Sequence, residues 1–223
     1  MRLIIFTAVM LCTPVVRAGA LPETERTGET QAALAMAFVA EAGWADPKNP
    51  EAKADHRAIY HVLLNRWPAL SKRYPERYER FVDVVRAYVA ALDPRTEKGR
   101  RVRWLRALSA GEYGIGAPPT GWPVEHARWD VHRVWWEQAL ARAKDCMHGR
   151  RCQDPYGGRA LHWGGAMDRP RGCMVRLPNR GTLNTFYAVD SKCRRRRERH
   201  RKARPDAGDR PVELRPTARR KSP

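Results

Sequence analysis

Apolar residues recur at helical spacing near the beginning of the chain. Leu34, Ala37 and Phe38 stand three and four positions apart, and Glu41 continues the series at the seventh position. A helix over this stretch would present the carboxylate of Glu41 on the same face as the core side chains. Gly43 follows where a left-handed C-cap residue would end the helix. The pattern predicts an apolar helix that carries one acidic side chain at its C-terminal end.

Four further helices are predicted from the same periodicity. A loop of Asp, Asn and Pro precedes a second helix over 51–67, which Pro68 is expected to end because proline interrupts helical hydrogen bonding. A third helix is predicted over 75–92, a short fourth over 101–110 and the longest over 124–147. The residues expected on their buried faces are Ala58, Ile59, Val62, Leu63, Tyr78, Phe81, Val82, Val85, Tyr88, Val89, Leu92, Val102, Leu105, Leu108, Trp129, Trp136, Leu140 and Ala143.

The helical period is lost in two regions. Residues 111–123 contain four glycines and three prolines, a composition typical of a long loop. Residues 155–193 hold short apolar or aromatic groups separated by Gly, Pro and Asn, which predicts short strands and loops. The sequence therefore predicts a mainly helical, α+β domain over 21–193 with a small β-containing or irregular C-terminal part. Residues 194–223 have almost no apolar side chains and are predicted to be a disordered tail.

The first twenty residues have the pattern of a secretory signal peptide. Arg2 supplies a positive charge, residues 3–16 form an apolar run too short for a membrane span, and residues 18–20 form a small-residue cleavage site. Cleavage near Ala20 would release a secreted or periplasmic protein. A lipoprotein signal through Cys12 is the weaker interpretation, because a leucine precedes it where a small residue is required. No later segment is expected to cross a membrane.

Four cysteines remain once Cys12 leaves with the signal peptide. In an exported chain they indicate two disulfides, for which three pairings exist. We favour Cys146–Cys152 and Cys173–Cys193, since each bond closes a loop within one local unit. Zinc is the alternative use of four cysteines, but no two of them form a C-x-x-C pair. No metal or cofactor is expected.

The chain is strongly basic, with a formal net charge of +19. Thirteen of its Lys and Arg residues, against four Asp and Glu, lie in 194–223. A basic exported protein is attracted to anionic polymers such as wall glycans and teichoic acids, to membrane surfaces or to nucleic acid. The charge indicates an anionic partner but does not distinguish among wall polymers, membrane surfaces and nucleic acid.

Glu41 is the first candidate for chemistry. Cleavage of a glycosidic bond needs a carboxylic acid that protonates the leaving oxygen, and apolar surroundings favour the protonated form of such an acid. Phe38 on the same helix face and Trp44 just beyond the helix would supply these surroundings. The structural alternative is an ion pair at the helix end, with Arg66 or another base. The candidates for a second carboxylate, none with a distinguishing context, are Asp46, Asp55 and Glu112.

Three segments, together with Glu41, resemble the cell-wall hydrolase family that includes spore-cortex-lytic enzymes. The second helix contains VLLNR over 62–66, a histidine segment reads ALHW over 160–163, and a closing motif reads NTFY over 184–187. Glu41 lies where this family has its catalytic acid. The resemblance implies a lysozyme-like domain that cleaves the glycan strand of peptidoglycan as a muramidase or a lytic transglycosylase. In a lytic transglycosylase one carboxyl group donates a proton and later removes one from the muramyl C6 hydroxyl.

The resemblance also implies that His162, Asn184 and Tyr187 shape a substrate cleft. His162 would hydrogen-bond substrate or orient the acid; the alternative is a buried imidazole that donates to a backbone carbonyl. Asn184 and Tyr187 both donate and accept hydrogen bonds, which suits sugar hydroxyl and acetamide groups, although strand packing would also explain the tyrosine. Trp122, Trp163 and Trp44 are candidates for stacking on sugar rings.

The sequence thus predicts an exported, monomeric enzyme that cleaves peptidoglycan glycan strands with Glu41 as a single general acid and base. Its basic tail would bind anionic wall polymers. The main alternative is a non-catalytic wall- or nucleic-acid-binding protein that kept the scaffold, in which binding depends on the arginines alone. A basic exported nuclease that uses His162 and Asn184 is a third interpretation, and it lacks a credible metal site.

Overall fold

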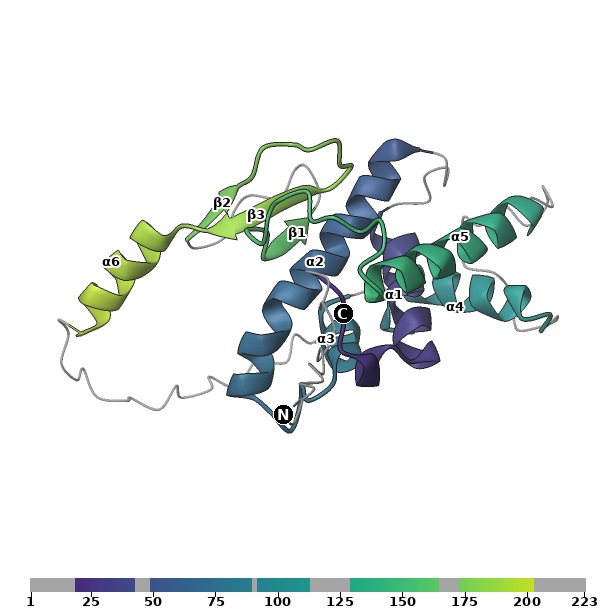
Figure 1. The fold of residues 1–223 in the computed structure, drawn as a ribbon, viewed down its shortest axis with the longest axis horizontal. Coiled ribbons are helices and arrows are strands. Elements are labelled where there is room, and N and C mark those ends of the chain that lie inside the picture. Colours follow the sequence, from purple (N-terminus) through teal and green to yellow (C-terminus); the bar gives the residue numbers. More distant parts are fainter. Residues whose placement is uncertain (1–18, 43–48, 90–91, 113–128, 165–172, 203–223) are drawn as a thin grey trace, which may run out of the picture.

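The structure is a computed structural model that describes residues 19–42, 49–89, 92–112, 129–164 and 173–202. It is mainly helical with one small antiparallel sheet, as the sequence predicts. The elements follow in the order η1 (Glu23–Glu25), α1 (Gly28–Glu41), α2 (Pro50–Arg73), α3 (Phe81–Tyr88), α4 (Glu97–Ser109), α5 (Trp129–Met147), β1 (His162–Gly164), β2 (Met174–Arg176), β3 (Thr185–Val189) and α6 (Ser191–Lys202), as Figure 1 shows.

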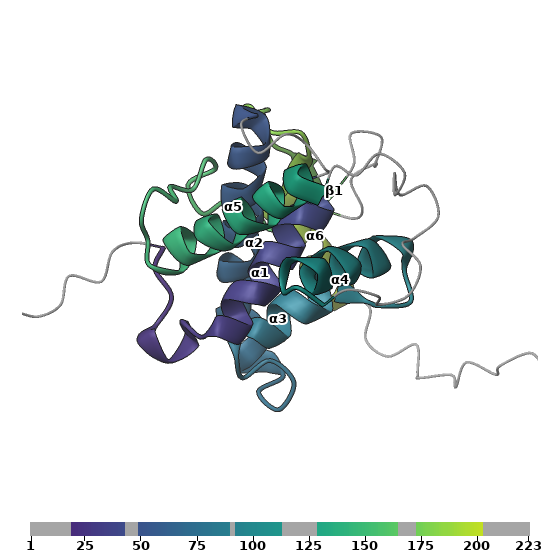
Figure 2. The same ribbon diagram turned by 90° about the vertical axis from the view of Figure 1, so that its right-hand side faces the viewer.

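The hydrophobic core forms where α1 meets its neighbours. α1 packs against α2, α3, α4 and α5, and Figure 2 shows it among α3, α4 and α5. Leu34, Ala37 and Phe38 are fully buried, which confirms the predicted apolar face of this helix. Leu108 and Leu140, by contrast, are only half-buried. The predicted core positions in the later helices that are fully buried include Ala58, Ile59, Val62, Leu63, Phe81, Val82, Val85, Leu105 and Ala143.

Capping side chains set where the first helices begin. The Thr27 hydroxyl accepts the backbone N–H of Thr30 at the start of α1, and the Asn49 side chain accepts that of Glu51 at the start of α2. Pro50 occupies the first turn of α2, where a missing N–H costs nothing. These caps satisfy N–H groups that have no partner inside the helix. They explain why α2 begins within one residue of its predicted start.

The second helix is longer than predicted, and the expectation that Pro68 ends it is wrong. α2 continues through Pro68 to Arg73. Trp67 and Leu70, on either side of the proline, pack against the hydrophobic core, and this packing supports the last turns although one N–H donor is missing. With 24 residues, α2 rather than α5 is the longest helix in the described part of the chain. Residues 124–128, the first of the helix predicted over 124–147, lie outside the described part of the chain.

The third helix is shorter than predicted. α3 begins at Phe81, and residues 75–80 form turns and bends instead. The backbone N–H of Phe81 donates to the Glu25 carboxylate (2.8 Å), and that of Arg80 donates to Asp83 (3.2 Å). Both contacts satisfy N–H groups at the first turn and thereby fix the start of the helix.

Three short strands form a sheet in the order β1-β3-β2, within the region where strands are predicted. β3 is central, and its Tyr187 pairs with His162 of β1 and with Arg176 of β2. α2 contacts β1 as well as α1 and α5. Figure 1 accordingly shows the sheet on one side of α2 and the other long helices on the opposite side. The domain therefore consists of a helical layer and a small sheet that meet at α2.

Two disulfides fasten the part of the chain that follows α5. Cys146 pairs with Cys152 and Cys173 pairs with Cys193, which confirms the predicted pairing. The first closes a tight loop at the end of α5, and the second joins the residue before β2 to the first turn of α6. The backbone N–H of Asp190 also donates to the carbonyl of Cys173 (2.6 Å), so the end of β3 is held beside the start of β2.

The beginning of the basic tail is helical, which corrects the prediction that the whole of 194–223 is disordered. α6 covers Ser191–Lys202, and residues beyond it lie outside the described part of the chain. Asp190 caps this helix by accepting the N–H of Lys192 (2.9 Å), and arginine and lysine are good helix formers. The side chains of 194–196 are exposed, and Figure 1 shows α6 extending away from the domain. The helix thus forms from local signals, and none of its described side chains belongs to the hydrophobic core.

The described chain joins the core next to the predicted cleavage site. Leu21 is buried, and its N–H donates to the carbonyl of Met147 at the end of α5 (2.9 Å). The Tyr60 hydroxyl donates to the carbonyl of Gly19 (2.7 Å). No helix in the described ranges is both long and apolar enough to span a membrane. Residues 1–18, which hold most of the predicted signal peptide, lie outside those ranges.

Candidate functional site around Glu41

Glu41 is the last residue of α1, and its side chain is only 14% exposed. The indole N–H of Trp163 in β1 donates to Oε2 of the carboxylate (3.4 Å), and Nζ of Lys98 in α4 lies 3.8 Å from the same oxygen. The ion-pair partner is therefore Lys98 and not Arg66. Because Lys98 is 59% exposed, the ion pair is screened by solvent and contributes little to stability.

Asn184 holds the backbone of Glu41 in place. Its side-chain amide donates to the carbonyl of Glu41 (2.7 Å) and to Oδ2 of Asp55 (2.9 Å). The backbone N–H of Asn184 approaches both carboxylate oxygens of Asp55 at 3.2 Å. The residue before β3 thus ties the end of α1 to the first half of α2. The sequence assigned Asn184 to substrate, whereas its two amide hydrogens are used within the protein.

Asp55 is a fully buried carboxyl group. Burial raises its pKa to about 6, against hydrogen bonds from Asn184 and from the backbone of Leu183, which lower it. Because it is enclosed and hydrogen-bonded to the protein, Asp55 supports the site from within and is not placed to activate a water molecule. Of the other candidates for a second carboxylate, Glu112 is exposed at the end of α4 and Asp46 lies outside the described residues.

The raised pKa of Asp55 predicts a specific pH dependence of stability. The folded protein holds this proton up to about pH 6, whereas the unfolded chain releases it near the ordinary pKa of 3.8. The stabilisation is therefore complete below the unfolded pKa and is lost as the pH rises through the folded one. Relative to Asp55→Asn, the wild-type protein should lose up to roughly 3 kcal/mol of unfolding free energy between about pH 4 and pH 6. Urea unfolding of both proteins across this range tests it, and parallel pH profiles would contradict it.

The VLLNR segment holds the strand that carries Trp163. The Asn65 side chain donates to the carbonyl of Ala160 (3.3 Å), and the Arg66 guanidinium donates to that of Leu161 (2.9 Å). The same guanidinium lies 3.9 Å from the ring centroid of Tyr88. Sequence reasoning used Asn65 and Arg66 only as part of a motif and missed this positioning role. The available signal was the placement of two polar residues directly after the buried face of a long helix.

His162 and Tyr187 lie together on the sheet. Their rings are 6.0 Å apart, and the two residues pair across β1 and β3. His162 is exposed, so the alternative of a buried imidazole is wrong, whereas Tyr187 is 2% exposed. Successive side chains of a strand point to opposite faces, so His162 points away from the face that presents Trp163 to Glu41. The structure therefore brings Trp163 and Asn184 to Glu41 and places His162 and Tyr187 beside each other on the strands.

The tryptophans differ in where the structure places them and in how far they are exposed. Trp163 is 8% exposed and serves as a hydrogen-bond donor to Glu41, so little of its ring is open to a ligand. Trp122 and Trp44 lie outside the described residues. Trp136 is in the core, as expected, while Trp135 is half-buried.

No protein-family model, curated protein or solved structure matches this chain. The resemblance to cell-wall hydrolases therefore rests on the motif residues and stays a prediction. The fold itself defines a mainly helical α+β domain with two disulfides. Within it, Glu41 contacts Trp163 and Asn184, which are 122 and 143 positions away along the chain.

Proposed function

We propose that this protein cleaves the glycan strand of peptidoglycan, with Glu41 as its general acid and base. One observation carries the proposal: Glu41 is held through its carboxylate by Trp163 and through its carbonyl by Asn184, each from a different motif segment. Within the described part of the chain, both partners of the carboxylate approach Oε2. In the proposed reaction, Oε1 carries the proton that passes to the substrate oxygen.

A single carboxyl group suits the chemistry of a lytic transglycosylase. Glu41 gives its proton to the leaving glycosidic oxygen as the bond from that oxygen to the muramyl C1 breaks. The C6 hydroxyl oxygen of the same sugar then bonds to C1, and its proton returns to Glu41, so the residue ends as it began. Lys98 and Trp163 stabilise the carboxylate while the proton is away, because both offer hydrogen toward Oε2. Asp55 takes no part in proton transfer.

Analysis of the reaction products tests this function. Purified peptidoglycan would be digested with the protein lacking residues 1–20, and the soluble muropeptides would be identified by mass spectrometry. The expected products end in 1,6-anhydromuramic acid. Products with reducing ends would retain glycan cleavage but replace the transglycosylase with a hydrolase, which needs a second carboxylate. An absence of soluble products would overturn the proposal and favour a non-catalytic binding protein.

We also propose that the basic tail holds the enzyme on anionic wall polymers. Residues 194–223 carry thirteen Lys and Arg against four Asp and Glu, and the side chains of 194–196 are exposed on α6. Truncation after Cys193, which keeps both disulfides, should weaken binding to purified walls several-fold at low salt and reduce its dependence on NaCl concentration. Co-sedimentation at several salt concentrations measures both. Unchanged binding and an unchanged salt dependence would refute this role.

A further inference from the structure

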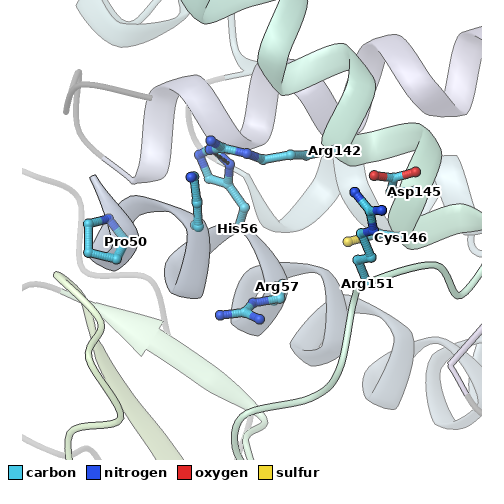
Figure 3. Close-up of a pocket in the computed structure, with 8 residues that line it drawn as sticks. Pro50, His56, Arg57, Arg142, Asp145, Cys146 and Arg151 are labelled. Atoms are coloured by element: carbon cyan, nitrogen blue, oxygen red, sulfur yellow. Dashed lines mark hydrogen bonds between the residues drawn. The ribbon is translucent and has the colours of Figure 1, made fainter. Parts of the chain in front are cut away.

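A second candidate site lies away from Glu41, between the first half of α2 and the second half of α5. It is a cavity of about 360 Å³, and Figure 3 shows Arg142 and Asp145 reaching it from α5 and Arg57 from α2. None of the residues that hold Glu41 lines this cavity. The polar side chains that line it are Lys53, His56, Arg57, Arg142, Asp145 and Arg151.

The cavity has an excess of positive charge. Four of its polar lining residues are Lys or Arg and one is Asp. His56 adds no charge, because burial and the neighbouring Arg142 lower its pKa to about 3. Its neutral ring stacks on Phe38 at 4.7 Å between centroids, and Nδ1 accepts a hydrogen bond from Arg142 (2.9 Å). His56 thus holds the Arg142 side chain in position without neutralising it.

Arg57 carries an unsatisfied hydrogen-bond donor in the described part of the chain. Nε of Arg57 is buried there and has no hydrogen-bond partner. Burial and the charge of Arg57 both lower the pKa of Arg142. Lys53 stands one helical turn before Arg57 and adds a further like charge. An unsatisfied buried donor and concentrated like charge are both unfavourable, and a bound anion would relieve both.

Arg151 reaches the cavity from a backbone that is unusual for its residue type. Its φ is 49°, the only positive value for a non-glycine residue in the described ranges. Left-handed backbone costs an ordinary residue free energy, and the loop closed by Cys146 and Cys152 holds Arg151 in it. The loop thus brings a third guanidinium to a cavity that α2 and α5 already line with cations (Figure 3).

We propose that this cavity binds a phosphate group. Arginine residues line it from α2, α5 and the loop after α5, so a ligand with oxygens in several directions meets more donors than a planar carboxylate does. Inorganic phosphate and phosphomonoesters also balance more positive charge than a single carboxylate, whereas a phosphodiester balances the same charge. The volume accommodates a phosphate with an attached glycerol or sugar unit. The phosphate is either free in solution or part of an anionic phosphodiester polymer, and this site is independent of the proposed chemistry at Glu41.

Titration of the purified protein with defined probes tests the proposal. The probes are inorganic phosphate, glycerophosphoglycerol as a phosphodiester, and glutarate as a carboxylate control, with binding measured by calorimetry. The double variant Arg57→Gln, Arg151→Gln should bind the preferred phosphate probe at least about tenfold more weakly than wild type. Arg103→Gln, Arg106→Gln removes the same charge from exposed positions of α4 and should change the affinity less than about twofold.

The outcomes separate the sources of the phosphate and decide the proposal. Tighter binding of inorganic phosphate supports a free ligand, and equal or tighter binding of the diester supports a polymer. The proposal is overturned if neither phosphate probe binds, if glutarate binds as tightly, or if both double variants lose affinity equally. Thermal unfolding gives a second readout: phosphate should raise the Tm of wild type and of the α4 variant, but not that of the cavity variant. Lys53→Gln replaces Arg57→Gln if the latter does not fold.

Discussion

Glu41→Gln should reduce the rate of glycan cleavage by about a thousandfold or more while the fold stays intact. General acid–base catalysis typically contributes 10²–10⁴ in rate, and an amide cannot supply the proton. The substitution keeps the size of the side chain and leaves an oxygen that accepts the Trp163 indole N–H. It removes only a solvent-screened ion pair with Lys98, so the Tm should change little. The rate of release of soluble fragments from labelled peptidoglycan, measured beside thermal unfolding, tests both statements.

A matched control separates loss of the acid from loss of negative charge. Glu112→Gln removes a carboxylate from an exposed position at the end of α4 and should leave the rate within about twofold of wild type. If Glu41→Gln kept a tenth or more of the wild-type rate, another group would have to be the proton donor. Equal losses in the two variants would point to charge-dependent binding to the wall instead of catalysis.

The second large effect is expected for Asn184→Ala. This substitution removes the amide that donates to the buried carboxylate of Asp55 and to the carbonyl of Glu41. The buried carboxylate of Asp55 would lose this donor but would stay buried and desolvated. The unfolding free energy should therefore fall by roughly 3 kcal/mol. Cleavage activity should fall as well, since the end of α1 is no longer tied to β3. Urea unfolding measures the first effect and the digestion assay the second.

Two comparisons make the Asn184 prediction specific. Asn179→Ala removes an exposed amide of the same segment that caps only a local turn and should cost less than about 1 kcal/mol. In an Asp55→Asn background the Asn184→Ala substitution should be less costly than in wild type, because the buried charge is already absent. Additive losses in the double variant would show that the two side chains act independently.

Features set by nearby residues could be predicted from the sequence. The buried face of α1 follows from spacing alone, so the burial of Leu34 and Phe38 and the position of Glu41 could be predicted. The disulfides were predictable because each cysteine pair is close along the chain. The strands were predicted from short aromatic groups between glycines and asparagines.

Features that depend on distant contacts could not be predicted. α3 begins at Phe81 because Glu25, 56 positions earlier, accepts its N–H, and no local pattern contains that information. The roles of Asn184 and Lys98 likewise follow from contacts that the residue before β3 and a residue of α4 make with the end of α1. Pro68 lies inside a helix because tertiary packing outweighs a local breaking signal.

The basic cavity likewise combines a feature that the sequence predicts with one that depends on distant contacts. Net charge was visible in the sequence, but its concentration between α2 and α5 was not, since His56 and Arg142 are 86 positions apart. One local sign was present: Lys53 and Arg57 are like charges one turn apart on a helix whose other face is apolar. Such a pair is unfavourable in isolation. The fold places it at a cavity, which the composition of the chain cannot show.

The position of the two disulfides shows which contacts at the site are left to non-covalent interactions. The helical layer that carries Glu41 contains no cross-link before the end of α5, whereas the sheet that follows is fastened by Cys173–Cys193. A disulfide of this kind typically contributes about 2–4 kcal/mol. Neither bond joins the sheet to the helical layer, because Cys146–Cys152 closes the loop after α5 and Cys173–Cys193 joins the start of β2 to α6. At the site, the hydrogen bonds from Asn184 to Glu41 and Asp55 therefore connect the two layers without a covalent link.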